Sequence, residues 1–567
     1  MRRPGRVFAI GGLAFAFLLL LLLVVSIAGC SAVPPAGDAS GDSGGDSGVG
    51  DGGGVSGSGG GSGVDGGIDP ATPRFVLLTA DPRGRPLALA RVILPAGSGC
   101  PAVAAGAGAP ASGIPMSPRS AEARFAFPQV CEAVVPFDTP LAIRFADGGE
   151  LSLPTVGRDP ARILAMGDTG CEDCDGEPAR PFADLAAVAA GDTWDVILHM
   201  GDYNYRGTPS KVTFPDGSQD WAYDAGDGTE ESESCLQSDG SAFVSQNAPG
   251  NTPHDSWSAW ELDFFTPAGE LLWSAPWVFA RGNHELCSRA GPGWLYFLGP
   301  SSDLPAVGGR QRRCPAADPP SRRQIENVQM IPPYLVDLGS LRIAVLDSAN
   351  ACDGFALPDM ADFTGAYARQ LGEIEAMVAG GTAPVWLMTH RPPWAVEDFE
   401  ADKGTRCAPD SPYQCVNQTL EHAIENGLSG GAWPAPVELS LAGHMHHFQS
   451  LTFPAGQQPP QVVIGNGGVG LGLYGPDGSF EAAVDTGGAS PARALGNALG
   501  KEAVAGGHTV PAFAFLEIDY RPGGAWSGRL MNTAEDVELA ACSSGRAASG
   551  RICDLTATPV PDAAASK

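Results

Sequence analysis

The stretch DVILHMGDYNY, residues 195–205, decides the fold of this 567-residue chain. Its apolar first half predicts a buried β-strand, and the strand ends in Gly201-Asp202, with Tyr205 three residues further on. In α/β sheets, binding sites form at the carboxyl ends of strands, where loops from several strands converge. A Gly-Asp pair after a strand is most often an ordinary turn, so this stretch alone does not predict a metal site.

Four further apolar runs end in the same way, each in a residue that can bind a metal cation. They are RILAM before Gly167-Asp168, PWVFA before Arg281-Gly282-Asn283-His284, PVWLMT before His390, and VELSLA before Gly443-His444-Met445-His446. Together they offer carboxylate, amide and imidazole ligands, which suit Zn²⁺, iron or Mn²⁺. The set contains no thiolate, and HExxH is absent because Leu-Cys-Ser follows His284-Glu285. We therefore expect the five loops to meet at one catalytic metal site.

The five blocks, in order along the chain, resemble the signature of the calcineurin-like metallophosphoesterases. The order is GD, GDxxY, GNHE, a lone His and GHxH, and the resemblance covers roughly residues 160–535. Gly167-Asp168-Thr169-Gly170, Tyr205 and the aromatic pattern at 257–264 are similar to the purple acid phosphatase branch. The resemblance implies an α/β fold with a four-layer αββα sandwich over 157–543, and a metal-dependent phosphoric ester hydrolase.

The resemblance also implies two metal ions, iron with Zn, Mn or a second iron. One ion would be held by Asp168, Asp202, Tyr205 and His446. The other would be held by Asp202, Asn283, His390 and His444, so that Asp202 bridges the pair. His284 stays outside both ligand sets. We expect it to protonate the leaving oxygen or to stabilise the charge of the transition state.

Two features depart from the purple branch. Its members usually carry another His shortly after the His of the fourth block, whereas Arg391-Pro-Pro-Trp follows His390 here. Arg391 could contact the substrate phosphate, and a structural ion pair is an equal alternative. Residues 206–252 are acidic and turn-rich, and they are inserted between the second and third blocks. This segment would lie at the rim of the site and could select substrates.

The favoured function is hydrolysis of phosphomonoesters by metal-activated hydroxide at the cell envelope. Two cations roughly 3.5–4 Å apart would stabilise the phosphoryl oxygens and lower the pKa of a bound water. A phosphodiesterase or nucleotide hydrolase with the same metal centre is the alternative, because the sequence does not show the shape of the pocket. A non-catalytic binding lipoprotein is a third interpretation, and the seven intact ligands argue against it.

The N-terminus indicates export. A basic start and a long apolar run end in Ile27-Ala28-Gly29-Cys30, which resembles the lipobox of a bacterial lipoprotein. The resemblance implies a signal peptide over 1–29 and a lipid on Cys30, and a permanent anchor helix is the alternative. Residues 30–71 are rich in Gly, Ser and Asp and predict a flexible tether. Ser31, in place of Asp, favours anchoring at the outer membrane or the cell surface.

The remaining segments and the charge complete the prediction. Short alternating strands between turn residues predict a small all-β sandwich over 72–156, ahead of the catalytic domain. Residues 544–567 are predicted as a C-terminal tail. With 34 basic against 64 acidic residues, a net charge of −30 argues against nucleic-acid binding. The phosphate ester is the expected partner, and the oligomeric state stays open.

Cysteine usage agrees with an oxidising compartment. Of the 13 cysteines, 12 remain once Cys30 is assigned to lipid, and an exported protein should pair them. The candidate pairs are Cys100 with Cys131, Cys407 with Cys415, and Cys542 with Cys553. The CxxC at 171–174 lacks a second CxxC, so we expect disulfide chemistry there and not zinc.

Overall fold

The computed structural model describes most of the chain after residue 67. The described residues are 68–106, 113–121, 127–171, 179–205, 211–213, 219–221, 255–286, 290–314, 330–351, 361–398, 413–415, 417–472, 475–484, 491–533 and 536–560. The predicted signal peptide, Cys30, the tether up to residue 67 and most of the 206–252 insertion lie outside these residues. Within the described ranges, no helix has both the length and the apolar character needed to cross a bilayer.

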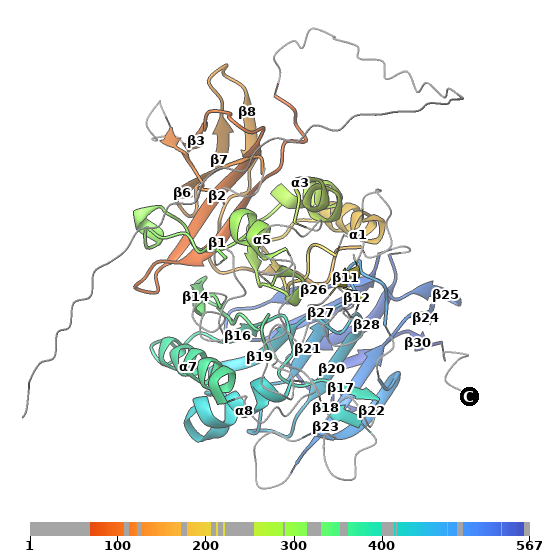
Figure 1. Ribbon diagram of the computed structural model, residues 1–567. Helices are drawn as coiled ribbons and strands as arrows, with labels where there is room; N and C mark the ends of the chain where they lie inside the picture. Colours follow the sequence, from red (N-terminus) through yellow and green to blue (C-terminus); the bar gives the residue numbers. More distant parts are fainter. Residues whose placement is uncertain are drawn as a thin grey trace, which may run out of the picture. The chain divides into compact units, whose positions relative to one another are not determined.

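Two large mixed β-sheets form the centre of the fold (Figure 1). The larger runs in the order β29 (Cys553–Leu555), β28 (Glu538–Ser543), β27 (Trp526–Asn532), β26 (Ala514–Tyr520), β9 (Arg162–Met166), β10 (Val196–His199), β13 (Trp277–Phe279), β1 (Arg74–Ala80), β2 (Pro86–Leu94), β6 (Gln129–Val135) and β5 (Ser117–Pro118). The smaller runs in the order β14 (Tyr334–Asp337), β15 (Arg342–Val345), β16 (Val385–Met388), β19 (Val437–Ala442), β21 (Gln461–Ile464), β20 (Phe448–Thr452), β23 (Ala492–Leu499) and β22 (Gly478–Val484).

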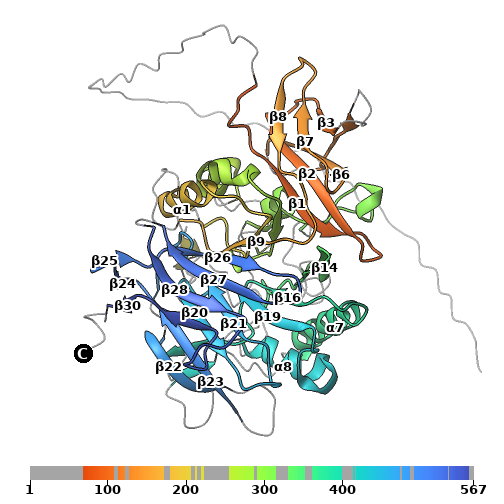
Figure 2. The same ribbon diagram turned by 180° about the vertical axis from the view of Figure 1, so that it is seen from behind.

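The two sheets pack face to face, and helices cover their outer faces. Ile163 and Leu198 of the larger sheet share one buried cluster with Ile343 and Leu441 of the smaller sheet. On the outer face of the larger sheet lie α1 (Arg180–Ala190) and α5 (Gly291–Phe297), and on that of the smaller sheet α7 (Ala361–Val378) and α8 (Gln418–Gly427). Figure 1 labels all four helices, and Figure 2 shows α1, α7 and α8 from behind. The predicted four-layer αββα sandwich is confirmed.

Helix α1 shows how the outer layers follow from the sequence. Pro181 lies in its first turn, where a missing N–H leaves no hydrogen bond unmade. Phe182, Leu185 and Ala189 recur at helical spacing, and all three are buried against the sheet. The other short helical segments are α3 (Trp257–Trp260), η2 (Glu261–Phe265), α4 (Thr266–Ala268), η3 (Gly269–Trp273), η4 (Asn283–Glu285), η5 (Pro305–Val307) and η7 (Ser429–Gly431).

The predicted N-terminal β region is built into the catalytic sheet. Its second sheet contains β4 (Ile114–Pro115), β3 (Ala102–Ala105), β7 (Leu141–Arg144) and β8 (Glu150–Leu153). Its first sheet, β1-β2-β6-β5, continues the larger catalytic sheet because β1 pairs in parallel with β13, with Leu77 opposite Trp277. Strand β13 therefore has a partner on each side and is not an edge strand. Residues 72–156 are all-β, as predicted, and one of their two sheets is continuous with the larger catalytic sheet.

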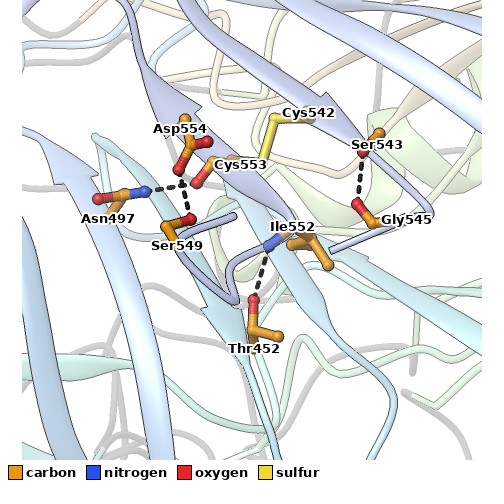
Figure 3. The surroundings of a disulfide bond; sticks show 9 residues. All are labelled: Thr452, Asn497, Cys542, Ser543, Gly545, Ser549, Ile552, Cys553 and Asp554. Carbon is orange, nitrogen blue, oxygen red and sulfur yellow. Dashed lines mark hydrogen bonds between the residues drawn. A yellow bond between two sulfur atoms is a disulfide. The ribbon is translucent and has the colours of Figure 1, made fainter. Parts of the chain in front are cut away.

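The C-terminal segment is also part of the sheets, which corrects the predicted tail over 544–567 as far as residue 560. A disulfide joins Cys542 of β28 to Cys553 of β29 (Figure 3). Around it, the Ile552 N–H donates to Thr452 Oγ1 of the smaller sheet at 2.9 Å, and Asn497 Nδ2 donates to the Cys553 carbonyl at 2.5 Å. Finally β30 (Thr558–Pro559) pairs with β24 (Glu502–Ala505), beside β25 (His508–Pro511). Pairing with the larger sheet and with this small three-stranded sheet fixes the segment.

Two of the predicted cysteine pairs are confirmed, Cys100–Cys131 and Cys542–Cys553. Cys171 is also disulfide-bonded, which agrees with the prediction of disulfide chemistry at the CxxC. The predicted pair of Cys407 with Cys415 lies outside the described side chains. Two antiparallel strand pairs complete the described elements: β11 (Lys211–Thr213) with β12 (Gln219–Trp221), and β17 (Val396–Asp398) with β18 (Tyr413–Cys415).

Candidate metal centre

The predicted ligands follow the carboxyl ends of five strands. In the larger sheet, β9, β10 and β13 are parallel neighbours, and the loops after them carry Asp168, Asp202 and Asn283. In the smaller sheet, β16 and β19 are parallel neighbours, and His390 and His444 follow them. Because parallel strands present their carboxyl ends at the same edge, loops from distant parts of the sequence meet there.

The ligand atoms form two groups that share one carboxylate. Asp202, His390 and His444 form one group, and Asp168, Asp202 and His446 form the other. Within each group, the candidate ligand atoms lie within 4.8 Å of one another. Asp202, which the family resemblance places between two metal ions, is the member common to both. The structure therefore brings these five side chains into one compact, paired arrangement.

Tyr205 and Asn283 join one group each. The Tyr205 hydroxyl lies 2.9 Å from Asp202 Oδ2, 3.2 Å from Asp168 Oδ1 and 3.1 Å from His446 Nε2. Asn283 Oδ1 lies 2.7 Å from His390 Nε2, which in turn is 3.3 Å from Asp202 Oδ2. All seven predicted metal ligands are thus gathered in the partition that the resemblance implies.

The loops that carry the ligands have an uncommon backbone conformation. Positive φ angles occur at Asp168 (58°), Asp202 (57°), His444 (76°) and His446 (47°). Non-glycine residues rarely adopt this region, and such strain clusters at functional sites. Gly443 also packs so closely that a Cβ there would overlap the Asp168 carboxylate, and one at Gly282 would overlap that of Asp202. The glycines of the motif therefore leave room for the carboxylates.

Burial makes the site electrostatically unusual. Asp168 and Asp202 are 0% and 1% exposed. Burial raises the pKa of Asp168 to about 8, and the nearby Asp202 charge acts in the same direction. Burial also opposes ionisation of Asp202, yet His390 and His284 hold the pKa of Asp202 well below its usual value. Burial lowers the pKa of His446 to about 3, so that its imidazole is neutral and has a lone pair available for a cation.

The donor set fits a pair of cations. Within the described part of the chain, the ion-pair partners of Asp168 and Asp202 are histidines: His446 for the former, and His284 and His390 for the latter. Two buried carboxylates without an Arg or Lys partner are costly unless a metal compensates them. Oxygen and imidazole donors in this number suit Zn²⁺, Mn²⁺ or iron.

The remaining histidines and Arg391 surround the ligands. His284 Nε2 lies 4.0 Å from Asp202 Oδ2, and its ring lies 3.8 Å from that of Tyr205 between centroids. Arg391 Nη1 lies 3.2 Å from His444 Nε2, and the side chain is buried. His199 lies in neither ligand group, and its Nε2 is 2.9 Å from Thr169 Oγ1.

Four buried charged residues near the site were not singled out by sequence reasoning. Arg281 Nη2 lies 2.9 Å from Asp347 Oδ2, which joins the loop after β13 to the loop after β15 in the other sheet. Glu285 and Asp263 accept backbone N–H groups of the 202–205 loop. Glu285 lies inside the quoted GNHE block, but neither spacing nor composition indicates what it contacts. No sequence signal marks Asp263.

Comparison with solved structures found distant likenesses. A purple acid phosphatase from yellow lupin (Lupinus luteus) seeds is 12% identical, with a TM-score of 0.42, covering 82% of this chain and 73% of that one. PhoD is 9% identical, with a TM-score of 0.42 and coverage of 88% and 94%. GAP50, the anchor in the inner membrane complex of Plasmodium, is 11% identical, with a TM-score of 0.31 and coverage of 66% and 86%.

Comparison with curated sequences gave no significant match. The family model for calcineurin-like phosphoesterases matches residues 161–448, about half of the chain, from the start of β9 to the start of β20. This range contains every predicted metal ligand, from Asp168 to His446. The chain therefore belongs to the calcineurin-like phosphoesterase family and is a metal-dependent phosphoester hydrolase.

Proposed function

We propose that this protein hydrolyses phosphomonoesters at the bacterial cell envelope. The observation that carries the proposal is the pair of ligand groups that share Asp202, with His284 and Arg391 beside them. A pair of metal ions supplies Lewis-acid stabilisation of the phosphoryl oxygens and an activated water nucleophile. Asp168, Tyr205 and His446 would hold one ion, Asn283, His390 and His444 the other, and Asp202 both.

We assign His284 to the leaving group. Its backbone N–H donates to Asp202 Oδ1 at 3.0 Å, and its ring packs against Tyr205, so both ends of the residue are fixed. Its Nε2 lies 4.0 Å from Asp202 Oδ2, beside the carboxylate common to both ligand groups. In our proposal this nitrogen transfers a proton to the leaving alkoxide oxygen.

We assign Arg391 to the substrate phosphate. Its Nη1 lies 3.2 Å from Nε2 of His444, one of the predicted metal ligands. A guanidinium is always charged and suits phosphate oxygens. A phosphomonoester brings more negative charge to this point than a diester, so an added cation favours the monoester. This residue would take the place of the second histidine that the purple branch carries after its fourth block.

The envelope location rests on the N-terminal sequence. A lipid on Cys30 would hold the protein at the membrane, and the tether over 30–71 would give the catalytic domain a reach of roughly 35 Å. Substitution Cys30→Ser should abolish labelling with a radioactive fatty acid and release the protein from the membrane fraction. Labelling that persists in the variant would exclude Cys30 as the lipidation site.

The catalytic proposal is tested with two substrates and one metal analysis. We expect the purified protein to contain two metal ions per chain and to cleave a chromogenic phosphomonoester faster than its bis-ester. Chelation should abolish the activity, and Zn²⁺, Mn²⁺ or iron should restore it. A visible charge-transfer band would identify ferric iron bound to Tyr205. Faster cleavage of the bis-ester would indicate a diesterase, and absence of both metal and esterase activity would indicate a binding protein.

A further inference from the structure

Two buried carboxylates outside the ligand set hold the backbone of the loop that carries Asp202 and Tyr205. Four consecutive N–H groups of this loop, from residue 202 to 205, donate to them. The N–H groups of Asp202, Tyr203 and Asn204 donate to Glu285 at 3.1, 2.9 and 3.2 Å. The N–H of Tyr205 donates to Asp263 Oδ2 at 2.8 Å. Since the loop is not in a sheet, these carboxylates replace the partners that a strand would provide.

Glu285 uses both of its oxygens. Its Oε1 accepts from Tyr203 and Asn204, and its Oε2 accepts from Asp202 and from Gly282 at 3.1 Å. The side chain is 0% exposed. It therefore joins two ligand loops: the loop after β10 with the bridging Asp202, and the loop after β13 with Asn283. One carboxylate thus sets the distance between ligands of both metal sites.

Asp263 contacts the Tyr205 end of the loop. It lies on η2, a five-residue π-helical turn in the aromatic layer, and it is 0% exposed. Such turns insert one extra residue into a helix and are frequent at functional sites. Its Oδ2 accepts the Tyr205 N–H. The Tyr205 hydroxyl contacts Asp168 and His446, so we assign Asp263 to that group.

We propose that Glu285 and Asp263 are positioning residues that assemble the metal centre before metal binds, Asp263 for the Tyr205 site and Glu285 for both sites. The inference rests on the proposed two-metal centre. The positive φ of Asp202 is a conformation that the loop does not adopt by preference, so fixed acceptors are needed to maintain it. Residues that orient metal ligands typically change metal affinity by 10–100-fold when mutated.

The chemistry of the two carboxylates predicts different responses to the amide substitution. In Asp263→Asn, the amide oxygen still accepts the Tyr205 N–H, so this variant should behave like the wild type, whereas Asp263→Ala removes the acceptor. In Glu285→Gln, one oxygen becomes an NH₂ donor facing the N–H groups of the loop. The amide NH₂ and the backbone N–H groups are then all donors and cannot hydrogen-bond with one another. Glu285→Gln should therefore not retain wild-type metal affinity.

The test is a calorimetric titration of the metal-stripped full-length protein with Zn²⁺ alone. We expect two sites in the wild type and in Asp263→Asn. In Asp263→Ala, one site should weaken by roughly 10–100-fold and the other should stay unchanged; in Glu285→Gln, both should weaken. Glu132→Gln is the matched control, because Glu132 is an equally buried carboxylate (2% exposed) whose partners are Arg91, Arg119 and Ser302, outside the ligand groups.

Each outcome decides between the alternatives. Wild-type affinity at both sites in Asp263→Ala would overturn the assignment of Asp263. Equal weakening in Glu132→Gln would show a general effect of destabilisation and would overturn the positioning role of both residues. If the wild type binds two Zn²⁺ ions but cleaves no phosphomonoester, the proposed function fails and the positioning role stands. If the wild type binds no Zn²⁺, both fall.

Discussion

Two clusters of buried charge in this protein contain carboxylates of equal burial and opposite character. Within the N-terminal β region, Glu132 of β6 lies 3.1 Å from Arg91 of β2 and 2.5 Å from Arg119. Burial opposes its ionisation, but the two guanidinium groups outweigh burial and lower the pKa of Glu132. At the metal centre, burial dominates instead and raises the pKa of Asp168 to about 8.

The difference lies in what compensates the charge. In the first cluster the chain itself compensates the carboxylate, with two arginines around one glutamate. The arginines also bind helix α5: Arg91 donates to the Phe297 carbonyl and Arg119 to the Tyr296 carbonyl, each at 2.8 Å. In the second cluster, histidines are the ion-pair partners of the two carboxylates within the described residues. A charge cluster completed by the chain stabilises structure, whereas one that needs a cation from solution is suited to catalysis.

The largest expected effect comes from removing the shared carboxylate. Asp202→Ala should lose both metal ions and lower kcat/KM by more than about 10⁴-fold, beyond what loss of a single general acid causes. The measurements are metal content and hydrolysis of a phosphomonoester. Retention of both ions in this variant would contradict the bridging role of Asp202.

His284→Ala should have a smaller effect at the same site. We expect kcat to fall by roughly 10²–10⁴-fold, the usual contribution of a general acid, while both metal ions stay bound. A substrate with a better leaving group needs less protonation, so the loss should be smaller for such an ester. Activity as low as in Asp202→Ala, or loss of metal, would show that His284 holds the centre together and does not donate a proton.

The sequence predicted the ligands because each one follows an apolar strand in a fixed motif. The strand ends position Asp168, Asp202 and His390, and no knowledge of long-range contacts is needed to list them. The residues that hold these loops were not predictable in the same way. Glu285 and Asp263 accept backbone N–H groups. Every residue except proline carries such a group, so neither residue type nor spacing predicts which side chain will accept it.

The fold, like the site, could be predicted only in part. The pattern of apolar residues predicts the strands that precede the ligands, such as β10 and β13. It does not predict that β1 pairs with β13, since Leu77 and Trp277 are far apart in sequence and either strand could have been an edge. Nor does it predict that residues 553–559 pair, because β29 and β30 are short and only their sheet partners define them.

Removing Glu132 tests the buried cluster that it forms with Arg91 and Arg119. Glu132→Ala should leave Arg91 and Arg119 buried without their counter-charge and lower the free energy of unfolding by about 3–5 kcal/mol. The measurement is urea unfolding of the metal-loaded protein. As a control, Glu481→Ala removes an exposed partner of Arg493 and should cost at most about 1 kcal/mol. Equal losses in both variants would contradict the structural role of the buried cluster.

The smallest expected effect is a pH dependence of this same cluster. The folded-state pKa of Glu132 lies below the usual value of 4.5, so its contribution to stability is complete above that pH and is lost as the pH falls through the folded-state pKa. Each unit of pKa shift corresponds to about 1.4 kcal/mol.

Glu132→Gln has no titrating group at this position. The difference in the free energy of unfolding between wild type and Glu132→Gln should therefore be constant from neutral pH down to about 4.5 and should narrow below it. A difference that stays constant through this range would mean that the two arginines do not lower the pKa of Glu132, and the contrast between the two charge clusters would then be lost.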